Sequence, residues 1–131
     1  MLSGGCLCGA VRYEAQGEPF GSGVCHCRTC RKANGAPMVA WFSVKAAAFT
    51  LVSGALTRFA SSDHAERGFC KICGSQIVFD DHRYPDEIDI ATASLDDEGA
   101  VTPEFHIWTR SQLPWVKLAD GLPTYPERSG S

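Results

Sequence analysis

The sequence has no long hydrophobic run, and its longest apolar stretch is PMVAWFSV at residues 37–44. A helix that spans a bilayer needs about 20 apolar residues, so this stretch is too short to cross a membrane. The N-terminal residues MLSGGCLCG have neither a basic start nor an apolar core. We therefore expect no secretory signal, no membrane partner and a cytoplasmic location.

The chain also has no excess of positive charge, since its formal net charge is −3. A nucleic-acid-binding domain usually carries a basic surface, so this balance disfavours nucleic acid as a partner. The sequence contains no glycine-rich phosphate loop, no Ser/His/Asp arrangement and no internal repeat. A chain of 131 residues without an obvious linker suits one domain, which we expect to span residues 1–131.

Short strand-like segments separated by turn residues dominate the pattern, which predicts an all-β domain of short antiparallel strands. These segments cover residues 10–15, 37–44, 49–52, 55–60, 75–80, 87–93 and 104–108. One helix of about two turns is expected over residues 28–34, because Gly35 and Pro37 follow it. The tail at about residues 122–131 is rich in Pro, Gly and Ser, and we expect a loop with a frayed end.

The chain is rich in cysteine, a residue type that binds metals, and contains seven of them. They form three groups: CLC (Cys6, Cys8), CHCRTC (Cys25, Cys27, Cys30) and CKIC (Cys70, Cys73). An odd number in a reducing compartment argues against a disulfide framework. A redox role for CKIC alone would be expected beside a βαβ unit, and the sequence predicts none. The clustering therefore indicates metal binding.

Zinc prefers four tetrahedral ligands at a structural site and three protein ligands at a catalytic site, so seven thiols divide naturally into four and three. Spacing leaves two divisions open. In the favoured one, the CLC and CKIC pairs share an ion and the remaining three thiols hold a second. In the other, the last two cysteines of CHCRTC pair with CKIC as a zinc ribbon, which needs a 39-residue insert between the two halves.

Four segments together resemble the glutathione-dependent formaldehyde-activating enzyme family, which includes centromere protein V. They are GGCLCGAVRYE, CHCRTCRKANGAP, FCKICGSQIVF and HIWTRSQLPWVKLADGLP, and the resemblance extends over about residues 3 to 125. It implies a small all-β fold called the β-tent. It also implies a structural zinc held by Cys6, Cys8, Cys70 and Cys73, and a catalytic zinc held by Cys25, Cys27 and Cys30.

The reaction implied by the resemblance joins glutathione to formaldehyde as S-(hydroxymethyl)glutathione, which is carbon–sulfur lyase chemistry run in reverse. An ion with three thiolate ligands keeps one position for a substrate thiol, which binds metal as its nucleophilic thiolate. The expected partners are therefore a small thiol such as glutathione and a small aldehyde. The alternative is a non-catalytic zinc-stabilised binding module or a zinc and thiol buffering protein.

Several other residues attract attention beside the cysteines. His26 lies between two expected ligands, but neighbouring side chains of an extended segment point apart, so we do not expect it to bind the same ion. His106 is interpreted as a hydrogen-bonded strand histidine, and the three tryptophans as packing residues. Three basic residues flank the CHCRTC group and either attract a carboxylate-bearing substrate or form a solvated face: Arg28, Arg31 and Lys32.

Overall fold

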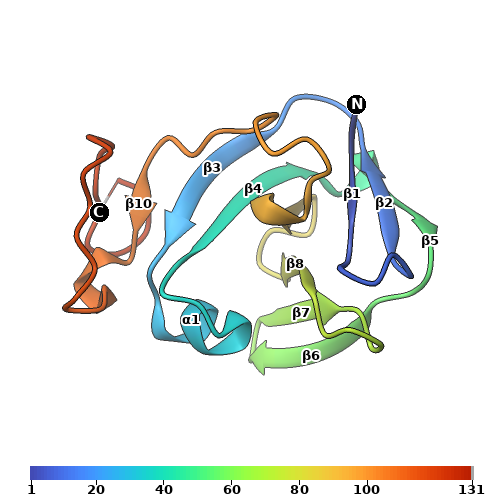
Figure 1. The fold of residues 1–131 in the computed structure, drawn as a ribbon, viewed down its shortest axis with the longest axis horizontal. Helices are drawn as coiled ribbons and strands as arrows, with labels where there is room; N and C mark the ends of the chain where they lie inside the picture. The colour runs from blue at the N-terminus through green and yellow to red at the C-terminus, as the bar shows by residue number, and fades with distance from the viewer. Residues whose placement is uncertain (131) are drawn as a thin grey trace.

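The computed structural model describes residues 1–130 and consists mainly of two β-sheets (Figure 1). The small sheet has the order β1-β2-β5, with β1 at Leu2–Gly5, β2 at Arg12–Ala15 and β5 at Phe49–Ser53. The large sheet has the order β10-β3-β4-β9-β8-β7-β6. Its strands are β3 Phe20–Cys25, β4 Val39–Lys45, β6 Thr57–Ser62, β7 Ala65–Phe69, β8 Gln76–Asp81, β9 Glu87–Ala91 and β10 His106–Ile107.

The predicted all-β class is confirmed, with one short helix, and each predicted strand region contains an observed strand. Three strands were not predicted, namely β1, β3 and β7. Glycines interrupt the apolar pattern in β1 (LSGG) and β3 (FGSGVC), and β7 (AERGF) carries adjacent charges. One pairing departs from the expected antiparallel arrangement, because β10 runs parallel to β3.

Side chains alternate between the two faces of the large sheet and so separate two apolar clusters. Phe42 and Ile90 pair across β4 and β9 and belong to the main core, which also contains Tyr13 of the small sheet. The next pair along, Trp41 and Ala91, packs instead with the cysteines of CHCRTC. Each large apolar side chain that is fully buried contributes about 1.5–3 kcal/mol. The main core therefore holds the sheets together and leaves the opposite face for a site.

The helix α1, at Arg28–Asn34, is the predicted one and carries the last cysteine of CHCRTC. The Cys27 sulfur caps it by accepting a hydrogen bond from the Cys30 backbone N–H at 3.3 Å. Gly35 ends it in the left-handed conformation, with φ 58°. Three short 3-10 turns occur at Ala46–Ala48, Thr92–Ser94 and Thr109–Ser111. No helix within residues 1–130 is long and apolar enough to cross a membrane.

The C-terminal segment lies beside β10, on the opposite side of the molecule from β1 and β2 (Figure 1). Residues 122–130 contain no helix or strand, and Ser131 lies outside the described residues. Backbone hydrogen bonds hold the first part of this segment against β10. His106 N–H donates to the Pro123 carbonyl at 2.9 Å, and Tyr125 N–H donates to the His106 carbonyl at 2.9 Å. β10 is thereby covered on its outer edge.

Candidate metal centres

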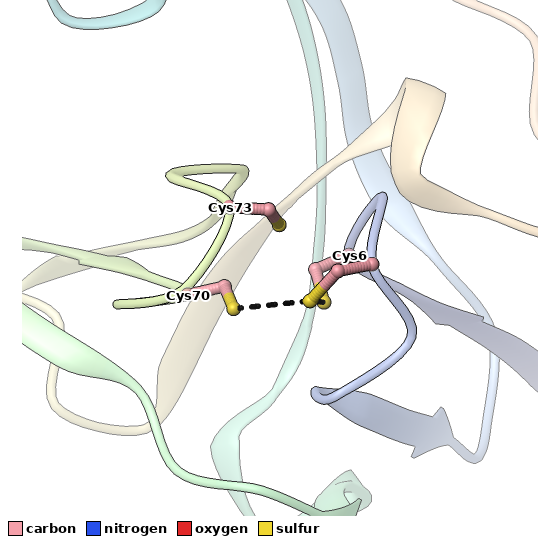
Figure 2. A group of neighbouring side chains, drawn as sticks. Cys6, Cys70 and Cys73 are labelled. Atoms are coloured by element: carbon pink, nitrogen blue, oxygen red, sulfur yellow. Dashed lines mark hydrogen bonds between the residues drawn. The ribbon is translucent and has the colours of Figure 1, made fainter.

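The four-cysteine group brings together Cys6, Cys8, Cys70 and Cys73, whose sulfur atoms all lie within 4.8 Å of one another. The first two come from the turn after β1, and the other two come from the turn after β7. Figure 2 shows the sulfurs of Cys6, Cys70 and Cys73 pointing toward one another from these two turns. The structure therefore agrees with the favoured division of the thiols, not with the zinc-ribbon alternative.

Backbone geometry in both turns keeps the sulfurs in place. Gly9 and Gly74 follow the two cysteine pairs and have φ angles of 83° and 79°, which other residues rarely adopt. The Gly74 N–H donates to the Cys70 carbonyl at 2.8 Å, which closes the second turn. The Ser75 hydroxyl, 3.2 Å from the Cys73 sulfur, lowers the pKa of that thiol to about 5. At neutral pH this favours the thiolate form that binds metal.

The distances between sulfur atoms distinguish a metal site from a disulfide. Sulfur separations are 3.6 Å for Cys6–Cys8 and 3.8 Å for Cys8–Cys70. A disulfide bond measures about 2.05 Å, so neither pair is covalently joined. Sulfurs at about 2.3 Å around a tetrahedral ion lie about 3.8 Å apart. The four thiols therefore fit one tetrahedral ion.

The triplet (Cys25, Cys27 and Cys30) forms the second group, with its sulfur atoms also within 4.8 Å of one another. Cys25 ends β3, Cys27 caps α1 and Cys30 lies in the helix, so a strand-to-helix turn gathers them. Cys25 and Cys30 are buried, and Cys27 is half-buried. Hydrogen bonds with the other two thiols lower the pKa of Cys27. No fourth histidine, cysteine or carboxylate within residues 1–130 joins this group.

Arg67 of β7 lies against the triplet and was missed by the sequence-based reasoning. Its side chain is only 4% exposed, and its Nη2 donates to the Cys30 sulfur at 3.6 Å. Its guanidinium also stacks over the Phe79 ring at 4.8 Å from the centroid. A guanidinium stays charged in a protein, and a buried charge needs an opposite charge nearby. Within residues 1–130 no carboxylate pairs with it, so thiolates are the available counter-charge.

The contact between Arg67 and the Cys30 sulfur bears on whether the triplet fits a metal ion. Three neutral thiols would leave the Arg67 charge uncompensated in a buried position. Three thiolates on a divalent cation carry a net charge near −1, which matches one guanidinium. The donor set and its charge environment therefore fit a thiophilic divalent metal ion.

A cavity of about 510 Å³ opens over the triplet, and we call it the triplet cavity. Its walls include Trp41, Phe79 and Trp108, and two of these belong to the strands of the large sheet. Asp89 of β9 also lines it and accepts a hydrogen bond from the Ser43 hydroxyl at 2.5 Å. Burial raises the pKa of Asp89 to about 6. The triplet thus faces a space with both apolar and charged walls that is large enough for a small molecule.

His106 of β10 is a hydrogen-bonded strand histidine, as expected, and one of its partners is His26. His26 is fully buried and is not part of the triplet, as expected from its place between Cys25 and Cys27. His26 Nε2 lies 2.8 Å from His106 Nδ1, and His106 Nε2 lies 2.7 Å from an Asp120 carboxylate oxygen. Burial lowers the pKa of His26. The pair therefore connects the triplet segment with the C-terminal segment.

The three basic residues flanking the triplet do not act alike. Arg31 turns back and donates from Nε to the His26 carbonyl at 3.1 Å, which braces the turn. Arg28 and Lys32 are exposed and line a separate cavity beside α1. Of the tryptophans, Trp41 is buried as expected, while Trp115 is exposed.

Comparison with known proteins places these groups in a family. The sequence profile described as glutathione-dependent formaldehyde-activating enzyme matches residues 1–111. An uncharacterized lyase of Schizosaccharomyces pombe is 38% identical over 76 residues, covering 58% of this chain and 55% of that protein. The chain thus matches about half the length of the yeast protein. A Halomonas elongata protein, named provisionally as a glutathione-dependent formaldehyde-activating enzyme, is 27% identical over 128 residues, covering 90% of this chain and 81% of that protein.

The fold is also shared with a solved structure. A crystal structure of a Rhodobacter sphaeroides protein matches with a TM-score of 0.59 and 24% identity, over 94% of this chain and 98% of that chain. The profile covers most of the chain, and all seven cysteines lie within the matched residues. The chain therefore belongs to the glutathione-dependent formaldehyde-activating enzyme family.

Proposed function

We propose that the chain binds two zinc ions and acts as a carbon–sulfur lyase on adducts of a small thiol with a small aldehyde. In this proposal the four-cysteine group holds a structural zinc, and the triplet holds a catalytic zinc. The observation that carries the proposal is the contrast between the two groups. The four-cysteine group offers a complete tetrahedral set, whereas the triplet offers three ligands beside a cavity of about 510 Å³.

The proposed reaction needs no oxidant or reductant. In the direction of synthesis, the thiol sulfur forms a bond to the carbonyl carbon. The carbon–oxygen double bond becomes a single bond, and the proton of the thiol ends on the oxygen as a hydroxyl group. The reverse reaction breaks the same carbon–sulfur bond and releases thiol and aldehyde. Glutathione and formaldehyde are the pair that the family description supports.

Zinc at the triplet would supply a thiophilic Lewis acid at which a substrate thiol loses its proton. The protein's own contribution is to hold the site. Trp41, Phe79 and Trp108 present apolar surface beside the reacting groups. Holding thiol and aldehyde together in this space favours their addition by proximity. Arg67 offsets the negative charge of the thiolates, which stabilises the group in its buried position.

A non-catalytic binding module or a zinc buffer would use the same cysteines, but neither requires a cavity beside the triplet.

The reaction is tested by following the exchange of glutathione and formaldehyde with their adduct by NMR. The zinc-loaded protein is expected to accelerate this exchange above the spontaneous rate. Cys27→Ser should abolish the acceleration, and Leu7→Ser, at an exposed position between two structural ligands, should keep it. A spontaneous rate with the loaded parent protein would refute the proposal.

A further inference from the structure

A second cavity, of about 580 Å³, lies between α1 and the edge of the large sheet. We call it the α1 cavity. Arg28 and Lys32 line it from successive turns of the helix, and Phe59 and Phe69 line it from β6 and β7. Arg67 belongs to the walls of both the α1 cavity and the triplet cavity. Thr29 and Ser61 are also shared, so the two spaces are neighbours with a common wall.

The α1 cavity is positively charged and has no internal counter-charge. Its lining includes three cations, Arg28, Lys32 and Arg67, and no carboxylate. Within residues 1–130 none of these three pairs with a carboxylate, and Arg67 contacts the triplet only through Nη2, at the Cys30 sulfur. Four other arginines each contact a carboxylate: Arg12, Arg58, Arg83 and Arg110. Cations without a carboxylate partner around one space favour an anionic ligand.

Unsatisfied polar atoms in the wall of the α1 cavity are a second, independent sign of a ligand, and Arg67 carries two of them. Its side chain is 4% exposed, and its Nε and Nη1 atoms have no hydrogen-bond partner. The Gln76 Oε1 atom, also in the wall of the α1 cavity, is buried without a partner as well. Buried polar groups of native proteins are nearly always hydrogen-bonded. Two such groups beside one cavity point to a ligand that supplies the missing contacts.

The triplet cavity is less suited to an anion. Its lining contains Asp81 and Asp89 beside the cations Arg67 and Arg83. Arg83 already donates to both Asp81 oxygens, at 3.1 and 2.8 Å, and the Asp89 carboxyl would repel a second carboxylate. A ligand that carries both a thiol and a carboxylate would therefore place its carboxylate in the α1 cavity and its sulfur toward the triplet.

We propose that the α1 cavity binds the carboxylate of a small thiol that carries one, through Arg28 and Lys32 at its rim and Arg67 at its base. The aromatic rings of Phe59 and Phe69 contact the aliphatic part of the ligand. This inference rests on the proposed function in one respect, namely that the ligand sulfur reacts at the triplet. It names the substrate class as anionic thiols in preference to neutral or cationic ones.

The first test compares three thiols of similar size with formaldehyde: 3-mercaptopropionate, 2-mercaptoethanol and cysteamine. Each catalysed rate is divided by the spontaneous rate of the same thiol, which removes differences in thiol acidity. The parent protein should show about tenfold greater kcat/KM enhancement for 3-mercaptopropionate than for the other two. Equal enhancement for all three would overturn the inference and leave the proposed function standing.

Two variants test the residues. The double variant Arg28→Gln, Lys32→Gln should lose about tenfold or more in kcat/KM with 3-mercaptopropionate, because a hydrogen bond to a charged group contributes about 1.5–3 kcal/mol. Its kcat/KM with 2-mercaptoethanol should change less than about twofold. The matched control Lys117→Gln removes an exposed charge that lines neither cavity and should leave both values unchanged. An equal loss with both thiols in the double variant would contradict the assignment.

A binding measurement keeps the inference testable without turnover. The unreactive 3-(methylthio)propionate should shift the backbone NMR signals of residues 28–33 in the parent protein, and bind about tenfold more weakly to the double variant. Binding without any catalysed reaction would refute the proposed function and support the α1 cavity as a carboxylate site. If 3-(methylthio)propionate causes no such shifts, the inference is wrong.

Discussion

His26 and His106, which are 80 residues apart in the sequence, are joined by a hydrogen bond of 2.8 Å between their rings. The Asp120 carboxylate accepts a hydrogen bond from His106 Nε2, so His106 Nδ1 is left to accept from His26 Nε2. The same contact lowers the pKa of Asp120. This chain fixes both tautomers and connects the segment that carries the triplet with the segment that covers β10.

We expect His106→Ala to destabilise the folded protein by about 2–4 kcal/mol, because it leaves the buried His26 N–H unpaired and opens a cavity. The free energy of unfolding, measured with urea on metal-loaded protein, checks this. His82→Ala is the matched control. The His82 side chain is half-exposed, and its ring contacts the Glu66 carboxylate. That variant should cost less than about 1 kcal/mol. Equal losses in the two variants would refute a special role for His106.

Replacing Cys70 by Ser should unfold the domain or strongly destabilise it. The four-cysteine group links the turn after β1 with the turn after β7, and structural zinc contributes on the order of 10 kcal/mol in small zinc domains. Ile72→Ser lies in the same turn at an exposed position and should behave like the parent. Thermal unfolding followed by circular dichroism gives the comparison. A Cys70→Ser protein that melts with the parent would show that this site is not structural.

Replacing Cys27 by Ser should leave the fold intact and remove one of two zinc ions. Cys27 caps α1, and serine is among the best residues at that position, so the helix keeps its cap while the triplet loses a thiolate. Elemental analysis of freshly purified, reduced protein should give close to two zinc ions per chain for the parent and close to one for the variant. Loss of both ions would contradict two independent sites.

Asp89→Asn should stabilise the protein at neutral pH. The folded-state pKa of Asp89 is raised to about 6, whereas an unfolded aspartate has a pKa of about 3.9. At a pH below both pKa values the carboxyl is neutral in the folded and the unfolded state, so the variant gains no free energy of unfolding over the parent. Between about pH 4 and 6 the parent loses stability as pH rises, and above pH 6 the difference stays constant at about 2–3 kcal/mol.

The measurement is the free energy of unfolding of the parent and of Asp89→Asn at pH 5, 6, 7 and 8. The stability advantage of the variant should grow as the pH rises from 5 to 7. Both proteins carry the same cysteines, so the difference between them removes the pH dependence of metal binding. The Asn side chain also keeps an oxygen for the Ser43 hydroxyl. A difference that does not change between pH 5 and 7 would refute the raised pKa.

The sequence by itself determined the features that depend on local spacing. Three tight cysteine groups, a two-turn helix before Gly35 and recurrent strand patterns are visible within windows of a few residues, and the structure contains them. Spacing left two divisions of the seven thiols open, and the structure groups Cys6 and Cys8 with Cys70 and Cys73. Strands β1, β3 and β7 were missed because glycine and adjacent charges obscure their alternation.

Only the tertiary structure decided what surrounds those groups. Arg67 lies 37 residues from Cys30 in the sequence and reaches it only because its side chain packs over Phe79, on the sheet face that carries the triplet. Asp89 also faces the triplet cavity. Nothing near either residue in the sequence marks it, since a charged residue in a strand is usually solvated. Contacts between distant strands are set by sheet order and register, and these emerge only when the whole chain packs.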